Sequence, residues 1–134
     1  METKNILIID DDVILTRSMQ AILEEHQYNV DVANDTTTGM EKFNSHKPDL
    51  LILDVMMDSD LAGHKLAHTI KSDLNNKDLP ILVITGMMDA IGVNIRDAFE
   101  GIDDLPSLTM LDKPFEMDEL LSRIKEMISG TQEE

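Results

Sequence analysis

The sequence predicts an α/β protein built on a parallel sheet of five strands, with helices on both faces of the sheet. Short aliphatic runs recur along the chain, and such runs are typical of strands that are buried on both faces. Segments with apolar residues at helical spacing separate these runs. A strand followed by a helix therefore repeats five times, and this alternation favours parallel strands joined by crossover helices.

The first part of the chain predicts two strands and a helix. Residues 5–9 contain an aliphatic run, and three aspartates follow it directly. Residues ~13–27 repeat apolar side chains at helical spacing, so we expect an amphipathic helix there. Residues 28–33 alternate between polar and apolar side chains. This alternation indicates a strand with one wetter face near an edge of the sheet.

The next part predicts a second helix and a fully buried strand. Asn34 and Asp35 are helix-capping residue types, and they precede an expected helix over residues ~35–46. Residues 50–53 are aliphatic and predict a strand in the middle of the sheet, which ends at the carboxylate of Asp54. A buried strand has no packing reason to end in an acid, so Asp54 indicates a functional site.

The second half of the chain predicts two more strands and three more helices. We expect a helix over residues ~62–75 and an aliphatic strand over residues 81–84, which ends at Thr85. Residues 89–99 can form a helix, although a glycine within this range weakens it.

The chain closes with a weaker strand and a clear helix. Residues 107–111 predict the fifth strand, and residues ~116–129 carry an apolar stripe at helical spacing. We expect Gly130 to end this helix because glycine is common just after helix C-termini. The prediction is one domain over residues 1–130, followed by a polar tail at residues 131–134.

Five strands of this kind fit the doubly wound, flavodoxin-like sandwich, in which the strands lie in the order 2-1-3-4-5. The first, third and fourth predicted strands are then neighbours, and the fifth flanks the fourth. Ligand sites in such sheets lie beyond the carboxyl ends of the strands. These four strands bring acidic, hydroxyl and ammonium groups to that edge: Asp10, Asp11, Asp54, Thr85 and Lys113.

The composition narrows the class of protein. A length of 134 residues is typical of a single domain, and the absence of cysteine excludes disulfides and thiolate zinc sites. No apolar run approaches the ~20 residues of a membrane helix, and the N-terminus lacks the form of a signal peptide. We therefore expect a cytoplasmic protein that does not bind membranes.

The charge is strongly negative. The chain has 27 acidic residues against 11 lysines and arginines, which gives a net charge of −16. This charge repels nucleic-acid phosphates and anionic lipid, so we expect no direct binding of nucleic acid. A solvated surface explains most of the excess. Three acids at the end of one core strand repel one another, however, and this indicates a cation between some of them.

The groups expected at the carboxyl edge match the needs of phosphoryl chemistry. Two or three carboxylates suit Mg²⁺, because that ion takes one or two carboxylates and keeps water for an incoming phosphate. A hydroxyl and an ammonium group can bind the remaining oxygens of a phosphoryl group. A carboxylate among them can act as a nucleophile and form an aspartyl phosphate.

Four segments also carry a resemblance to a known family. They are residues 6–12 (ILIIDDD), 49–57 (DLLILDVMM), 81–85 (ILVIT) and 112–115 (DKPF). Together they resemble the motifs of response-regulator receiver domains, the CheY-like phosphorylated modules of two-component signalling systems. Each motif alone is common. The four in order, on five strand-helix units that span nearly the whole chain, are highly specific.

The resemblance implies a role in phosphoryl transfer for three of these residues. Asp54 would accept a phosphoryl group from a phosphohistidine on a sensor histidine kinase or a histidine phosphotransfer protein. Thr85 would be the switch hydroxyl that moves toward the phosphoryl group. Lys113 would pair with the same group through its ammonium.

The resemblance also implies a magnesium site. Asp10 and Asp11 would be the acidic pair that holds Mg²⁺, together with Asp54 and the backbone carbonyl of Met56. Asp10 and Asp11 are chosen because they follow the aliphatic strand directly. This choice leaves Asp12 as the cap of the next helix.

The sequence departs from the family pattern at several positions. Asp58 stands where a proline is usual, and Met110 replaces the aromatic residue that most receivers carry three positions before the lysine. The aromatic switch therefore has no counterpart here. Met56 and Met87 occupy the two positions that bear on the lifetime of the phosphoryl group. Methionine holds an attacking water poorly, so we expect slow hydrolysis.

Two other functions are weaker alternatives. A Mg²⁺-dependent phosphohydrolase usually carries a second acid two residues after its nucleophile, and Met56 at that position argues against turnover. A pseudo-receiver that is never phosphorylated is disfavoured by the intact acidic, hydroxyl and lysine positions. We therefore expect a signalling module, not an enzyme, that acts on a downstream protein target. The sequence leaves homodimerisation open.

Overall fold

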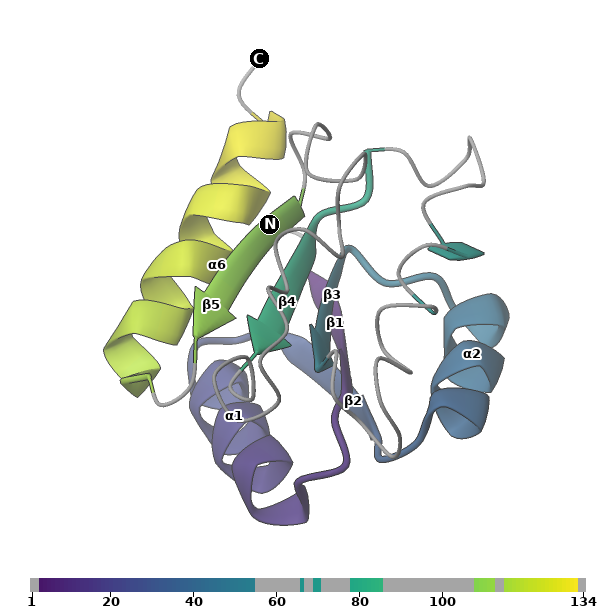
Figure 1. Cartoon of the computed structure of the whole chain (residues 1–134). Helices are drawn as coiled ribbons and strands as arrows, with labels where there is room; N and C mark the ends of the chain where they lie inside the picture. The colour runs from purple at the N-terminus through teal and green to yellow at the C-terminus, as the bar shows by residue number, and fades with distance from the viewer. Residues whose placement is uncertain are drawn as a thin grey trace.

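The computed structural model describes residues 3–54, 66, 69–70, 78–85, 108–112 and 115–132. These residues form a five-stranded parallel sheet in the order β2-β1-β3-β4-β5. Helix α2 lies on one face of the sheet, and helices α1 and α6 lie on the other (Figure 1). The predicted α/β sandwich with strand order 2-1-3-4-5 is therefore confirmed.

The strands begin and end within one residue of the predicted positions. Their bounds are Asn5–Ile9 for β1, Asn29–Ala33 for β2, Leu50–Asp54 for β3, Ile81–Thr85 for β4 and Leu108–Asp112 for β5. All five residues of β3 are buried, as expected for a central strand covered on both faces. Strand β5 begins and ends one residue later than predicted, because its pairing with β4 extends to Thr85 opposite Asp112.

Strand β2 is the edge strand that the alternating sequence predicts. Its first four side chains alternate between exposed and half-buried. The backbone N–H of Asn29 donates to the carbonyl of Lys4 at 2.9 Å, and the carbonyl of Ala33 accepts from Asp10 N–H at 3.1 Å. Successive residues of a strand direct their backbone groups to opposite sides. The backbone groups of Val30 and Val32 therefore point away from the sheet.

Aspartates begin the first two helices. Helix α1 (Val13–Glu25) has Asp12 as its N-cap, and α2 (Thr36–Ser45) has Asp35. Each side chain accepts a backbone N–H three residues later, which satisfies one of the free donors of the first turn. The prediction that Asn34 shares the capping of α2 is wrong, because Asn34 bonds instead to the turn after β1.

Helix α6 (Met117–Gln132) continues past the predicted end. We expected Gly130 to stop this helix, and this prediction is wrong, because residues 131 and 132 are helical. The last two residues of the predicted tail, 133 and 134, lie outside the described residues. Glycine costs a helix only about 1 kcal/mol relative to alanine, and no proline follows that would block the next turn. A single glycine near the end of a helix is therefore tolerated.

Most of the two helices predicted between β3 and β5 lies outside the described residues. Within the range 62–75 the structure describes Leu66, Thr69 and Ile70, and all three are helical. Leu66 and Ile70 are buried in the core on the α2 face of the sheet. The helix predicted over residues 89–99 lies outside the described part of the chain.

The sheet separates two apolar cores. On the α2 face, β1, β3 and β4 pack against Phe43, and on the other face they pack against α1 and α6 through residues such as Met19 and Ile124. Gly39 lets α2 approach the sheet closely, since a Cβ at this position would lie 2.6 Å from Ile9 Cδ1. The carboxyl ends of β1 and β3 are therefore held by packing on both faces. Within the described residues, no helix has the length and apolarity to cross a membrane.

Candidate functional site

Three carboxylates converge at the carboxyl ends of β1 and β3. The two strands pair in parallel with Ile9 opposite Leu53, so Asp10 and Asp54 occupy the next position of each strand. One carboxylate oxygen from each of Asp10, Asp11 and Asp54 lies within 4.8 Å of the other two. The parallel register of the sheet is thus the direct cause of this cluster.

The burial of Asp10 and Asp54 makes their proximity costly. Asp10 is fully buried and Asp54 is 5% exposed, whereas Asp11 is exposed to solvent. Two carboxylates at this separation repel each other by roughly 3 to 4 kcal/mol at an effective dielectric constant of about 20. A bound cation would convert this repulsion into attraction.

The donor set fits magnesium. Mg²⁺ prefers oxygen ligands at about 2.1 Å, so opposite ligands of one ion lie about 4.2 Å apart. The carboxylate oxygens of the acidic cluster lie within 4.8 Å of one another, which is the scale of the separation between ligands of one such ion. Among the described residues, Asp10, Asp11 and Asp54 could therefore hold this ion.

Hydrogen bonds fix Asp10 on several sides. Its backbone N–H donates to Ala33 O at 3.1 Å, and its Oδ1 accepts from Asp12 N–H at 2.9 Å. The Nδ2 of Asn34 donates to the backbone carbonyl of Asp10 at 2.7 Å. The sequence interpretation missed Asn34 as part of this turn. The sequence shows only a polar residue directly after an edge strand, which is equally typical of a helix cap, and the bond itself depends on the register of β2 against β1.

Asp12 is separate from the acidic cluster. Its Oδ1 accepts the backbone N–H of Leu15 at 3.0 Å and so caps α1. The prediction that Asp12 serves as a helix cap is confirmed, and the cluster contains Asp10, Asp11 and Asp54 without it.

The structure describes the other predicted site residues only in part. Thr85 is the last residue of β4, and its neighbour Ile84 pairs with Asp54, so the backbone of Thr85 reaches the same edge of the sheet. Strand β5 ends at Asp112, directly before Lys113 in the sequence. Lys113 and Met56 lie outside the described residues.

Among the positions that depart from the family pattern, the structure places only Met110 within its described residues. Met110 lies in β5 opposite Val83 of β4. Asp58 and Met87 lie outside the described residues.

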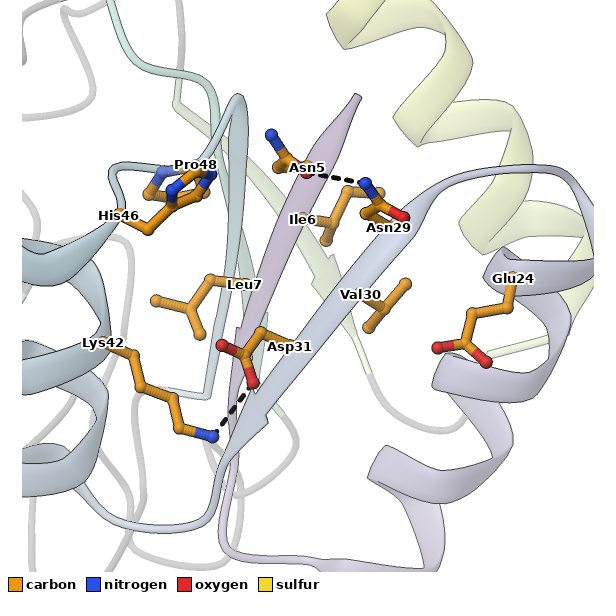
Figure 2. Close-up of a pocket in the computed structure, with 10 residues that line it drawn as sticks. All are labelled: Asn5, Ile6, Leu7, Glu24, Asn29, Val30, Asp31, Lys42, His46 and Pro48. Atoms are coloured by element: carbon orange, nitrogen blue, oxygen red, sulfur yellow. Dashed lines mark hydrogen bonds and ion pairs between the residues drawn. The ribbon is translucent and has the colours of Figure 1, made fainter. Parts of the chain in front are cut away.

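A groove of about 330 Å³ lies at the opposite end of the sheet from the acidic cluster. Figure 2 shows its polar lining, in which Lys42 reaches Asp31 and Asn29 reaches Asn5. Lys42 Nζ lies 2.9 Å from Asp31 Oδ1, and Asn29 Nδ2 lies 3.1 Å from Asn5 Oδ1. Ligands of such sheets bind beyond the carboxyl ends of the strands, so we place the functional site at the acidic cluster instead.

Comparison with known proteins identifies the family. A family model described as the response regulator receiver domain matches residues 6–125. The chain belongs to the response-regulator receiver family. Receiver domains of this family are the signalling modules of two-component systems, and the predicted CheY-like fold and family are confirmed.

Relatives of this receiver domain include longer proteins. Response regulator MprA of Mycobacterium avium (strain 104) is 34% identical over 129 residues, which cover 96% of this chain and 53% of that protein. MprA of Mycobacterium leprae (strain TN) is 36% identical over 126 residues, which cover 94% and 51%. The receiver domain thus spans about half the length of these curated relatives.

Solved structures share the fold of the receiver domain. A putative response regulator from Chloroflexus aurantiacus J-10-fl has a TM-score of 0.78 and 26% identity, and the match covers 96% of this chain and 99% of that one. A CheY-like receiver domain protein from Methanospirillum hungatei JF-1 has a TM-score of 0.81 and 23% identity, with 98% of each chain covered. The second likeness concerns the fold alone.

Proposed function

We propose that this receiver domain accepts a phosphoryl group on Asp54 in a reaction that depends on Mg²⁺. The observation that carries the proposal is the cluster of Asp10, Asp11 and Asp54, whose carboxylate oxygens lie within 4.8 Å of one another. Asp54 is 5% exposed and ends a fully buried strand, so the packing of the sheet holds its carboxylate in place. Membership of the receiver family supports the same assignment.

The proposed reaction is the transfer of a phosphoryl group between two side chains. A carboxylate oxygen of Asp54 attacks the phosphorus of a phosphohistidine on a partner protein. A new O–P bond forms while the N–P bond breaks, and the imidazole nitrogen keeps the electron pair of that bond. Asp10, Asp11, Asp54 and the backbone carbonyl of Met56 would hold Mg²⁺, which neutralises charge on the phosphoryl oxygens when bound.

Two further residues complete the proposed site. The hydroxyl of Thr85 and the ammonium of Lys113 would bind phosphoryl oxygens that the metal leaves free. The support for Thr85 is its place at the end of β4, one position beyond the residue that pairs with Asp54. The support for Lys113 is its place in the sequence directly after β5.

The partners follow from this chemistry. The phosphoryl donor would be a sensor histidine kinase or a histidine phosphotransfer protein, and the phosphorylated form would act by contacting a downstream protein. With methionine at positions 56 and 87, neither side chain holds an attacking water well, so the domain would lose its phosphoryl group slowly by itself. It would catalyse only its own phosphorylation and this slow dephosphorylation.

One experiment separates this function from the two alternatives. The full chain is incubated with Mg²⁺ and acetyl phosphate as a small phosphodonor, and intact mass is compared between the wild type and Asp54→Asn. A receiver gains a single phosphoryl group that Asp54→Asn lacks, and it keeps the group after the donor is removed. Turnover of many equivalents would indicate a phosphohydrolase, and no gain in mass would indicate a pseudo-receiver.

A further inference from the structure

Asn34 links the edge strand of the sheet to the acidic cluster. It follows β2 directly, and its Nδ2 donates to the backbone carbonyl of Asp10 at 2.7 Å. The residue before it, Ala33, accepts the backbone N–H of Asp10 at 3.1 Å. Both backbone polar groups of Asp10 are therefore bonded to two consecutive residues at the end of β2.

These two hydrogen bonds hold the backbone of Asp10, the first residue beyond β1. Its carboxylate accepts the backbone N–H of Asp12 at 2.9 Å, so the side chain is held on one side by the start of α1. The bond from Asn34 sets the orientation of the peptide that follows Asp10. Because that peptide leads into Asp11, its orientation also sets where the Asp11 carboxylate can lie.

We propose that Asn34 is a positioning residue for the metal site, which it serves by fixing the turn that carries Asp10 and Asp11. This inference rests on the proposed function, because it assumes that these acids bind Mg²⁺. Asn34 is itself exposed, so water can reach the Asp10 carbonyl once the amide is removed. Such a water would satisfy the carbonyl but, without a covalent tether, it would not fix the orientation of the turn.

The chain offers a matched control for this residue. Asn29 also joins β2 to β1 through its side chain, and its Nδ2 donates to Asn5 Oδ1 at 3.1 Å. Asn29 and Asn34 both reach 24 residues back along the chain to a partner at one end of β1. Asn29, however, lies at the amino ends of the strands, far from the acidic cluster. Replacing it removes a similar bond without touching the site.

The test is the binding of Mg²⁺ to the full chain by isothermal titration calorimetry. For Asn34→Ala we expect a dissociation constant roughly tenfold higher than that of the wild type, as is typical when a residue supporting the metal ligands is removed. For Asn29→Ala we expect a change smaller than about twofold. Equal constants for the two variants would overturn the inference and leave the proposed function standing. If the wild type neither binds Mg²⁺ nor gains a phosphoryl group, the proposed function itself fails.

A second readout separates positioning from general loss of structure. Phosphorylation of Asp54 by acetyl phosphate is followed as a function of Mg²⁺ concentration. For Asn34→Ala we expect the half-saturating Mg²⁺ concentration to rise roughly tenfold while the maximal rate stays near that of the wild type. A lowered maximal rate with unchanged Mg²⁺ dependence would contradict a positioning role. If Asn34→Ala is unfolded at the assay temperature, Asn34→Ser, which places a shorter donor there, is held to the same two criteria.

Discussion

A carboxylate oxygen of Asp54 lies within 4.8 Å of one from Asp10, because β1 and β3 pair in parallel and both acids follow the last paired positions. This proximity of the two carboxylates depends on the register of a sheet whose central strands are buried on both faces. It therefore depends on the fold and not on a flexible loop, so single substitutions can test it without rebuilding the site.

Asp11 and Asp12 should differ sharply in their effect on magnesium binding. Asp11→Asn removes one charge from the acidic cluster, and we expect the dissociation constant for Mg²⁺ to rise by more than roughly tenfold. Asp12→Asn keeps a good N-cap, and we expect a change of less than about twofold. Calorimetry of the two variants checks this. A loss of Mg²⁺ affinity in Asp12→Asn as large as that in Asp11→Asn would show that the acidic pair is shifted by one residue.

Because Asp12 caps α1, its replacement should change the stability of the fold. Asp12→Ala should lower the free energy of unfolding by about 1 kcal/mol, because the backbone N–H of Leu15 loses its partner. Urea denaturation of Asp12→Ala and Asp12→Asn measures this difference.

Gly39→Ala should destabilise the fold, although alanine is the better helix former. A Cβ at this position would lie 2.6 Å from Cδ1 of Ile9, which is fully buried. Overpacking of this kind costs about 1 to 3 kcal/mol, whereas the gain in helix propensity is at most about 1 kcal/mol. We expect a net loss of about 1 kcal/mol in urea denaturation.

The control for Gly39 is a variant of its neighbour. Ile9→Val removes Cδ1, so Gly39→Ala should cost less in the Ile9→Val background than in the wild type. An equal cost in both backgrounds would show that contact with Ile9 is not the cause.

Asp35 should make the fold more sensitive to acid. Hydrogen bonds from the backbone N–H and the hydroxyl of Thr38 hold the pKa of Asp35 below its ordinary value of 3.8. A lowered pKa in the folded state means that the stabilisation is fully present above the unfolded-state pKa. It declines as the pH falls below 3.8 and is gone once the pH is below the folded-state pKa.

Asp35→Asn isolates this contribution, because asparagine also caps helices but does not titrate. We expect the wild type to lose stability faster than Asp35→Asn as the pH falls from about 6 to about 3. Urea denaturation across this range gives the difference in free energy of unfolding. A difference that stays constant over the whole range would refute the prediction.

Lys42 should protect the exposed edge of β2 from pairing with another chain. The outward N–H of Val32 donates to Asp31 Oδ1 at 3.0 Å, and its carbonyl accepts from Lys42 Nζ at 2.7 Å. Lys42 Nζ also lies 2.9 Å from Asp31 Oδ1. Side chains of the same molecule thus occupy both outward backbone groups of Val32, and unoccupied edge groups are what recruit a further strand.

We expect Lys42→Met to increase self-association with rising protein concentration, as measured by light scattering. Its stability should change by less than about 1 kcal/mol, because the ion pair is partly exposed. Arg123→Met is the control, since it removes one positive charge from a pair on α6 whose nitrogen and oxygen lie 3.9 Å apart. Equal self-association of both variants would show that charge, and not the edge of β2, is responsible.

Strands β1, β3 and β4 could be predicted from the sequence, because each is buried on both faces and therefore needs an unbroken aliphatic run. The alternation of residues 28–33 likewise predicted the edge strand β2. Gly130 misled the prediction because helix propensity is a weak preference, and the sequence around residues 117–132 carries no stronger stop. Helix propensity alone could not show where α6 ends.

Around the acidic cluster, too, some features could be predicted from the sequence and others could not. The proximity of Asp10, Asp11 and Asp54 could be predicted because they lie just beyond aliphatic runs on strands that a doubly wound sheet brings to one edge. Asn34 could not, because its bond to the Asp10 carbonyl depends on the exact register of β1 against β2. In the sequence Asn34 is indistinguishable from a capping residue, and only the sheet shows that it bonds to Asp10.

The most direct test of the account is to locate the phosphoryl group by chemistry. The full chain is phosphorylated with acetyl phosphate and Mg²⁺, reduced with borohydride, which converts an aspartyl phosphate to homoserine, and digested for mass spectrometry. The account predicts homoserine at position 54 and its loss when Mg²⁺ is replaced by a chelator. Homoserine at Asp10, at Asp11 or at another acid in place of Asp54 would contradict it.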